Sequence, residues 1–278
     1  MKISLVVSDV DATLITPEHE ITPRAANAVH ELRKRGIAFT IASSRPPRGL
    51  YDFAEQLGLT EPFAAFNGGV IQTRDGETVI KHSLSRAVCE QAFEITEHFG
   101  IGLWLYCDHD WHVDRITPFV EREQNTIGFP AKIESDLTQV FGTAAKIVIV
   151  GDPILVAQAE PVVLEKIGAE VSATKSKPRF LDITAKQAHK GAVVTELAGI
   201  LKIPTAEIAV LGDGFNDILM FERAGFSIAM GQSSDEVKSA ASVVTKSNTE
   251  EGFAEALEEI ILRDQSSIKE FEIIQWEI

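Results

Sequence analysis

A short apolar segment near the amino terminus ends in two aspartates, and this junction constrains the fold strongly. The segment Ile3–Ser8 is apolar without strict alternation, which is typical of a β-strand buried on both faces. Asp9 and Asp11 follow it, separated only by Val10. Because carboxylates this close together repel one another, the junction predicts a bound cation. A divalent metal that serves phosphate chemistry is the usual solution.

Further polar residues follow other predicted strands. Asp213 and Asp217 come after Ile208–Leu211, in the segment Gly212-Asp213-Gly214-Phe215-Asn216-Asp217. In a parallel sheet, ligands bind beyond the carboxyl ends of the strands. The sequence therefore predicts a site at that edge of a sheet.

A hydroxyl, an amide and a lysine complete this predicted site. Ser43 follows the strand Ile37–Ala42, Asn67 follows Phe63–Phe66, and Lys190 begins a helix. Together with the carboxylates they form the set of groups that phosphoryl transfer needs, since its catalysis depends on positioning and charge stabilisation.

The predicted elements divide the chain into a core and an insertion. Strands alternate with helices up to residue 82 and again from residue 188, whereas residues 83–187 predict helices beside a mostly antiparallel sheet. We predict an α/β fold: a Rossmann-like, doubly wound parallel-sheet core domain (1–82 and 188–278) with an inserted α+β cap domain (83–187). Apolar residues at 273, 274 and 276 predict that the tail docks on the core.

Size and charge narrow the classes of function. A chain of 278 residues suits a core domain with a smaller second one, and a net charge of −15 argues against nucleic acid and anionic membranes as partners. Cys89 and Cys107 are too few for a disulfide framework, and the chain has no apolar stretch of membrane-spanning length. We expect a cytoplasmic monomer or weak homo-oligomer that binds a small phosphate ester.

Each candidate residue also has a purely structural interpretation. A buried strand that ends in two acids favours a site over a simple turn, but the second acidic pair alone is explained equally well by a turn and a helix-start charge. Ser43 could cap a helix, and Asn67 could occupy a left-handed turn. Lys190 could be a solvated lysine, and Arg45 could form a surface ion pair.

Four motifs, in this order along nearly the whole chain, resemble those of haloacid dehalogenase superfamily phosphatases of the Cof type, which carry a class IIB cap. One Asp-x-Asp-x-Thr motif alone would be a weak signal, but the ordered set with a cap-sized insertion is a strong one. The motifs are Asp9-Val10-Asp11-Ala12-Thr13, Ser43-Ser44-Arg45-Pro46, Lys190-Gly191 and Gly212-Asp213-Gly214-Phe215-Asn216-Asp217.

The resemblance implies catalytic and metal-binding roles. Asp9 would be the nucleophile that forms an aspartyl-phosphate, and Asp11 would protonate the leaving oxygen and then activate water. Mg²⁺ would be held by the Asp9 carboxylate, the Asp11 backbone carbonyl and Asp213, with Asp217 supporting the metal shell.

It also implies a set of substrate contacts. Ser43, Asn216 and Lys190 would contact phosphate oxygens. Ser44, Arg45 and Asn67 would contact the substrate or support those residues.

The chain departs from the family pattern at several positions, Ala12 and Gln232 among them. Glycine is usual where this chain has Ala12, and asparagine is frequent where it has Gln232. A left-handed alanine would cost roughly 1–2 kcal/mol, so either the turn has a negative φ or the fold accepts strain. Neither departure removes a catalytic atom.

A hairpin predicted in the cap, formed by Gly102–Cys107 and Trp111–Arg115, offers candidate substrate contacts. Trp104, Tyr106 and Trp111 could hold a sugar ring, although we expect at least one tryptophan to be core. Lys175, Lys177 and Arg179 could meet a second anionic group, but a solvated basic loop is favoured.

The leading hypothesis is a Mg²⁺-dependent phosphatase acting on small phosphorylated metabolites, sugar phosphates among them. One alternative is a phosphomutase or other phosphotransferase that uses the same aspartyl-phosphate. The other is a phospho-metabolite-binding protein that has lost turnover.

Overall fold

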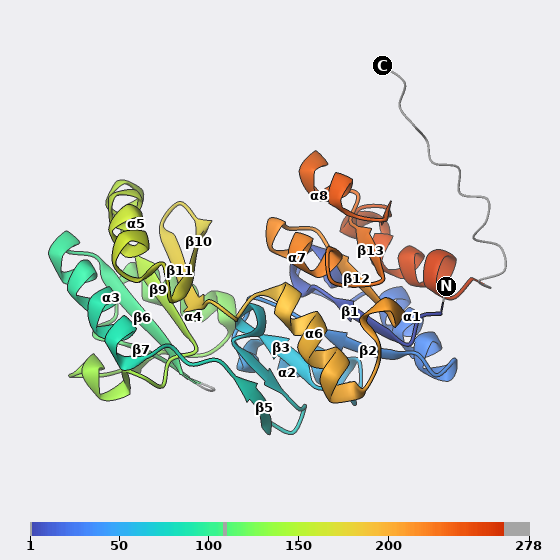
Figure 1. The fold of residues 1–278 in the computed structure, drawn as a ribbon, viewed down its shortest axis with the longest axis horizontal. Coiled ribbons are helices and arrows are strands. Elements are labelled where there is room, and N and C mark those ends of the chain that lie inside the picture. The colour runs from blue at the N-terminus through green and yellow to red at the C-terminus, as the bar shows by residue number, and fades with distance from the viewer. Residues whose placement is uncertain (1, 108–109, 264–278) are drawn as a thin grey trace, which may run out of the picture.

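The core of the molecule is a five-stranded parallel sheet. The computed structural model describes residues 2–107 and 110–263, so the tail predicted to dock lies outside it. The strand order is β14-β13-β12-β1-β2, and every neighbouring pair is parallel (Figure 1). The strands are β1 (Leu5–Ser8), β2 (Ala38–Ile41), β12 (Ile208–Gly212), β13 (Phe226–Ala229) and β14 (Val243–Val244).

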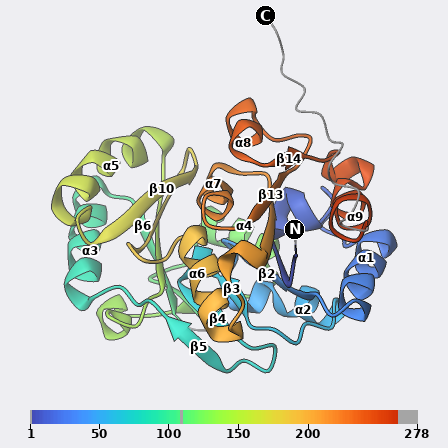
Figure 2. The same ribbon diagram turned by 45° about the vertical axis from the view of Figure 1, so that its right-hand side comes forward.

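Helices cover both faces of this sheet, as the prediction of a doubly wound core requires (Figure 2). Val6 packs with the face that holds α1 and α9, whereas Leu5 and Val7 pack with the face that holds α6, α7 and α8. This alternation explains why the first strand is apolar at successive positions. The helices are α1 (Pro23–Lys34), α6 (Lys190–Leu201), α7 (Ile218–Phe221), α8 (Asp235–Ala240) and α9 (Gly252–Glu255), the last continued by a π-helical segment (Ala256–Ile261).

Local signals set the ends of α1. The Thr22 hydroxyl accepts a hydrogen bond from the Ala25 backbone N–H at 3.1 Å, and Pro23 occupies the first helical position. Gly36 follows the helix with φ of 75°, a left-handed conformation that glycine adopts readily. Both ends of α1 are therefore set by residues of its own local sequence.

A small antiparallel sheet extends the core. It contains β3 (Phe63–Ala65), β4 (Val70–Gln72) and β5 (Thr78–Lys81), and β4 and β5 form an antiparallel hairpin. A parallel bridge between Ala42 and Ala64 links it to the strand before Ser43. The short helix α2 (Tyr51–Gln56) lies between β2 and β3 in sequence.

A second, mostly antiparallel sheet lies beside the core. Its order is β10-β11-β9-β6-β7-β8, and α3 (Arg86–Phe99) and α5 (Pro153–Ile167) cover one face (Figure 1). The predicted domain boundaries at residues 83 and 187 stay a prediction. The strands are β6 (Gly102–Cys107), β7 (Asp110–Val113), β8 (Lys132–Ile133), β9 (Lys146–Val150), β10 (Val171–Lys177) and β11 (Phe180–Ala185).

Two strands of this second sheet were not predicted. β10 and β8 are the edge strands, and both are polar or exposed along much of their length. They form because their neighbours offer backbone hydrogen bonds, which local sequence does not reveal.

The uncovered face of the cap sheet turns toward the core. The Phe66 ring of the core lies 5.6 Å from the ring of Tyr106 on β6, and α4 (Pro118–Ile127) flanks the same side. In the described part of the chain, no helix combines the length and apolar character needed to cross a bilayer.

Candidate active site

The topology brings the two acidic motifs together. The chain leaves β1 toward β2 on one side and returns beside β1 on the other side as β12, so the carboxyl end of β1 is a topological switch point. The Asp9 backbone N–H donates to the Leu211 carbonyl at 2.9 Å. The nucleophile candidate therefore lies next to the loop that carries Asp213 and Asp217.

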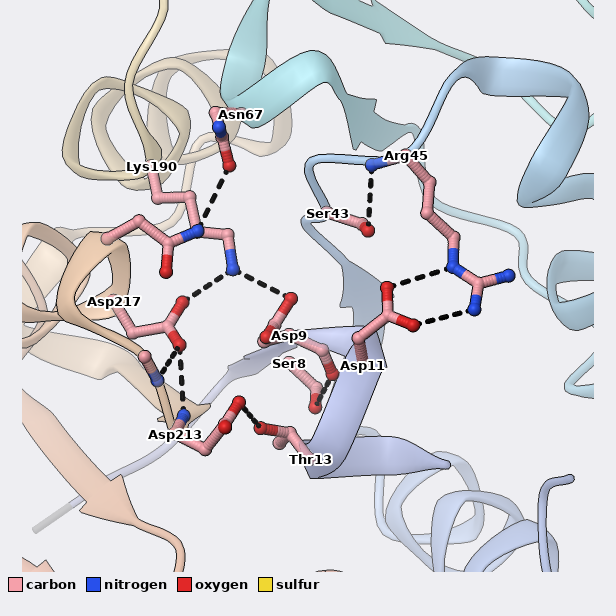
Figure 3. Close-up of polar contacts among 12 residues, drawn as sticks. Ser8, Asp9, Asp11, Thr13, Ser43, Arg45, Asn67, Lys190, Asp213 and Asp217 are labelled. Atoms are coloured by element: carbon pink, nitrogen blue, oxygen red, sulfur yellow. Dashed lines mark hydrogen bonds and ion pairs between the residues drawn. The ribbon is translucent and has the colours of Figure 1, made fainter. Parts of the chain in front are cut away.

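A buried lysine joins two of the acids. Lys190 Nζ lies 2.7 Å from Asp9 Oδ1 and 2.5 Å from Asp217 Oδ1, and its side chain is fully buried (Figure 3). Asp217 Oδ2 accepts the backbone N–H groups of Asp213 and Gly214, each at 2.9 Å. Asp217 thus fixes both the lysine and the turn that presents Asp213.

Burial disturbs the protonation of these groups. Burial raises the pKa of Asp9 well above its ordinary value, Lys190 opposes that rise, and Asp217 adds to it. Burial and Asp217 raise the pKa of Asp213. The pKa of Lys190 is raised although burial alone would lower it, because Asp217 and Asp9 stabilise the ammonium. The site is short of positive charge.

The carboxylate cluster fits a hard divalent cation. Carboxylate oxygens of Asp9, Asp213 and Asp217 all lie within 4.8 Å of one another. An all-oxygen ligand set is the kind that Mg²⁺ prefers. Lys190 can balance only one of the three negative charges, so a divalent ion would neutralise the remainder.

Asp11 has a different partner. Its carboxylate accepts two hydrogen bonds from the Arg45 guanidinium, at 2.8 Å from Nε and 2.6 Å from the terminal nitrogen. Figure 3 shows this carboxylate turned toward Arg45, on the other side from Lys190. The same guanidinium nitrogen lies 3.3 Å from His19 Nδ1. The two acids of the first motif are therefore held apart by separate cations.

The turn after Asp11 accepts strain. Ala12 has φ of 56° and ψ of 7°, the left-handed conformation, which decides between the two alternatives left by the sequence. Gln232 Nε2 donates to the Ala12 carbonyl at 2.5 Å, and Gln232 Oε1 accepts from the Asn248 backbone N–H at 3.1 Å. Thr13 Oγ1 donates to Asp213 Oδ1 at 3.1 Å, tying this turn to the metal candidates.

The remaining candidates line the same edge of the sheet. Ser43 is fully buried and its hydroxyl accepts from the Arg45 backbone N–H at 3.1 Å, so it also caps its own turn. Asn67 has φ of 58°, as its structural interpretation predicted, and its side-chain oxygen accepts from Asn216 Nδ2 at 3.2 Å. Ser44 is exposed and borders the neighbouring cavity. The contacts are compatible with the predicted roles, which remain predictions.

The part of the chain that forms this site matches a known family. A model of haloacid dehalogenase-like hydrolases matches residues 6–257. This chain belongs to that family.

Individual relatives of this hydrolase agree with the assignment. A Haemophilus influenzae protein named for phosphatase activity is 32% identical over 263 residues, covering 93% of this chain and 98% of the relative. A haloacid dehalogenase-like hydrolase from Bacteroides thetaiotaomicron superposes with a TM-score of 0.86 at 26% identity, covering 93% and 100% of the two chains. A subclass IIB sugar phosphatase shares the fold with a TM-score of 0.80 at 22% identity, covering 92% and 98%. The predicted family, fold and class of enzyme, a haloacid dehalogenase phosphatase, are confirmed.

A cavity of about 340 Å³ opens beside the catalytic edge of this phosphatase. Asp11, Ser44 and Arg45 border it from the core, and Trp104 and Tyr106 border it from the cap. A small leaving group would therefore meet aromatic side chains of the cap.

Two other side chains of the predicted cap hairpin, Trp111 and His112, contact neighbouring residues of the cap. Trp111 is fully buried and its ring stacks on Tyr106 at 5.6 Å, so at least one tryptophan is core, as expected. His112 Nδ1 lies 2.8 Å from Glu134, and His109 falls outside the described residues.

Sequence reasoning missed three further charged residues that line this cavity, namely Glu123, Lys146 and Asp182. For two of them, the sequence contains a feature that could have indicated the role. Lys146 begins an otherwise apolar strand, and Asp182 interrupts the apolar run of β11.

Proposed function

We propose that this phosphatase is a Mg²⁺-dependent phosphomonoesterase that hydrolyses small phosphorylated metabolites, sugar phosphates among them, through an aspartyl-phosphate on Asp9. The separate pairing of the two motif acids is the observation that carries the proposal. Asp9 lies beside Lys190 within the carboxylate cluster, whereas Asp11 lies outside that cluster and borders the cavity. This arrangement supports Asp9 as the group that attacks phosphorus and Asp11 as the group that transfers a proton to the leaving group.

Mg²⁺ would be held by the carboxylates of Asp9 and Asp213 with Asp217 in support, and by the Asp11 backbone carbonyl. When bound, the ion would offset the charge of the phosphoryl oxygens. The excess negative charge of the cluster supports this assignment. Among the described residues that form it, three carboxylates lie around one ammonium.

The protein groups would then divide the reaction. An Asp9 oxygen attacks phosphorus, the bond from phosphorus to the leaving oxygen breaks, and Asp11 donates a proton to that oxygen. Water next attacks the phosphorus of the aspartyl-phosphate while Asp11 takes its proton, and the bond from Asp9 to phosphorus breaks to release inorganic phosphate. Both Asp11 oxygens accept from Arg45 in this structure, so proton transfer requires one of these hydrogen bonds to be exchanged for the leaving oxygen.

Phosphate contacts would come from the loops around Asp9. Lys190, Ser43 and Asn216 would bind phosphoryl oxygens, with Ser44, Arg45 and Asn67 beside them. Ser43 and Lys190 are both buried at this edge, which supports the assignment. The acidic composition and cysteine content further support a cytoplasmic monomer or weak homo-oligomer.

Phosphate release from a panel of phosphorylated metabolites, measured with Mg²⁺ and with EDTA, tests the proposal. We expect release that requires the metal, and a loss on the order of 10³-fold or more in Asp9→Asn. Near-wild-type turnover in that variant would exclude Asp9 as the nucleophile. Bisphosphate-dependent isomerisation without net phosphate release would identify a phosphomutase. Tight ester binding with no turnover would identify a binding protein.

A further inference from the structure

The cap presents a sheet face of mixed character to the active site. Strand alternation and register place six side chains on this face: Trp104 and Tyr106 from β6, Lys146 and Val148 from β9, and Phe180 and Asp182 from β11. The opposite face is apolar and packs beneath α3 and α5. On β6, β9 and β11, the charged side chains Lys146 and Asp182 therefore lie on the face that borders the cavity.

A poorly exposed ion pair lies at the centre of this face. Lys146 Nζ is 2.7 Å from Asp182 Oδ2, and the two side chains are only 12% and 13% exposed. Replacing such a pair with apolar residues of similar volume is often neutral or stabilising, so stability alone is a weak reason to hold it there. Its position on the cavity wall indicates a role in binding.

A second carboxylate enters the cavity from α4. Glu123 Oε1 accepts a hydrogen bond from the Tyr106 hydroxyl at 3.2 Å. Burial raises the pKa of Glu123, and the nearby Lys146 ammonium opposes that rise. Because the Tyr106 hydroxyl donates to only one of the two carboxylate oxygens, Glu123 can accept a further hydrogen bond.

We propose that Tyr106, Glu123, Lys146 and Asp182, called here the cap polar cluster, determine substrate specificity by hydrogen-bonding the hydroxyl groups of a polyhydroxylated leaving group. The proposal rests on the phosphomonoesterase function proposed above. Each hydroxyl group both donates and accepts, which matches a wall that alternates carboxylate oxygens with an ammonium and a phenol. The cluster would be unfavourable for a second phosphate, since the Lys146 charge is paired and Glu123 would repel an anion.

The basic side chains near β10 supply the competing interpretation. Lys177 borders the cavity and is exposed, with its ammonium 5.9 Å from the Phe180 ring. Lys175 instead pairs with Glu160 at 2.6 Å, and Arg179 lies over Phe119. If the substrate carried a second anionic group, Lys177 would be its binding residue.

Three probes separate these possibilities: a hexose 6-phosphate, the corresponding 1,6-bisphosphate, and p-nitrophenyl phosphate, which lacks hydroxyl groups. For the wild type with Mg²⁺ we expect kcat/KM to be highest for the hexose monophosphate, by about tenfold or more over the other two. Glu123→Gln and Asp182→Asn should lower kcat/KM for the hexose monophosphate about tenfold or more, mainly through KM. The same variants should change p-nitrophenyl phosphate hydrolysis less than about twofold.

A double variant separates a loss of substrate binding from a loss of folding. Lys146→Met combined with Asp182→Leu removes both partners of the ion pair, so neither partner is left buried alone. Because Glu123 then loses the nearby ammonium, the thermal midpoint should stay close to that of wild type rather than rise. Its kcat/KM for the hexose monophosphate should fall to that of the single variants. Lys175→Met is the matched control, because it removes a paired lysine outside the cavity, and it should leave all three rates unchanged.

The outcomes distinguish this proposal from the proposed function. If the wild type releases phosphate but the cluster variants lower all three rates equally, or none, the specificity proposal is wrong. A preference for the bisphosphate that disappears in Lys177→Met would also overturn it. If the wild type releases phosphate from no ester, the phosphomonoesterase function fails and the specificity proposal fails with it.

Discussion

The core and the cap each bury charged groups, but they hold them in different ways. In the core, backbone N–H groups of the Asp213 turn fix Asp217, and Asp217 and Asp9 share the fully buried Lys190. In the cap, Lys146 and Asp182 pair directly across neighbouring strands and keep some exposure. The core cluster carries excess negative charge, whereas the cap pair is balanced. On the proposed function, the reaction would depend on core side chains that the backbone holds in place, and substrate choice on cap side chains that pair with each other.

Replacing the buried lysine of each region should give the largest difference in stability between the core and the cap. We expect Lys190→Met to reduce the free energy of unfolding by about 3–5 kcal/mol, because it leaves Asp9 and Asp217 buried without an ammonium. Lys146→Met should cost clearly less, since Asp182 retains some contact with water. Urea unfolding of both variants measures the difference. Equal losses would show that the two regions hold charge in the same way.

Metal removal should affect the core alone. Saturating Mg²⁺ at about a hundredfold over its Kd should stabilise the wild type by about 2.7 kcal/mol, measured as a rise in thermal midpoint that EDTA reverses. Asp213→Asn should abolish that rise, and the matched change Asp182→Asn in the cap should preserve it. A metal-dependent rise that survives Asp213→Asn would place the ion elsewhere.

Relief of the backbone strain at Ala12 should stabilise the turn that follows Asp11. Ala12→Gly should increase the free energy of unfolding by about 1 kcal/mol, because glycine adopts the left-handed conformation without steric conflict. Urea unfolding checks this. Gln232→Ala should destabilise the wild type more than the Ala12→Gly variant, since the amide contact to the Ala12 carbonyl then holds a turn that needs less support. Additive effects of the two substitutions would contradict that coupling.

The smallest expected effect is the contribution of Glu123 to the pH dependence of stability. Burial raises its pKa in the folded protein, so the folded state binds that proton more tightly than the unfolded chain. The ionised side chain therefore lowers stability above the folded pKa, and this penalty disappears below the ordinary value of 4.5. Glu123→Gln should stabilise the protein by on the order of 0.5 kcal/mol at neutral pH and have no such effect in acid. Unfolding curves across this range test it, and a neutral-pH loss of stability would contradict the assignment.

Much of the core could be predicted because its signals are local. The first acids follow a run of apolar residues, α1 begins at a capping threonine with proline behind it, and the motifs occur in a fixed order. The strand β10 was missed because its sequence, Val-Ser-Ala-Thr-Lys-Ser-Lys, lacks an apolar pattern. It forms through backbone hydrogen bonds to β11, whose position in the sheet is a property of the whole cap.

The sequence by itself determined the family, the doubly wound core, and the placement of Asp9, Asp11, Asp213 and Lys190 at strand or helix ends. Those features depend on residue type and short spacing. The tertiary structure decided which charge meets which: Arg45 with Asp11, Lys190 with both Asp9 and Asp217, and Lys146 with Asp182. It also decided that Ala12 is left-handed and that Glu123 enters the cavity. These pairings join residues far apart in the chain, and only strand register and packing bring their side chains within hydrogen-bonding distance.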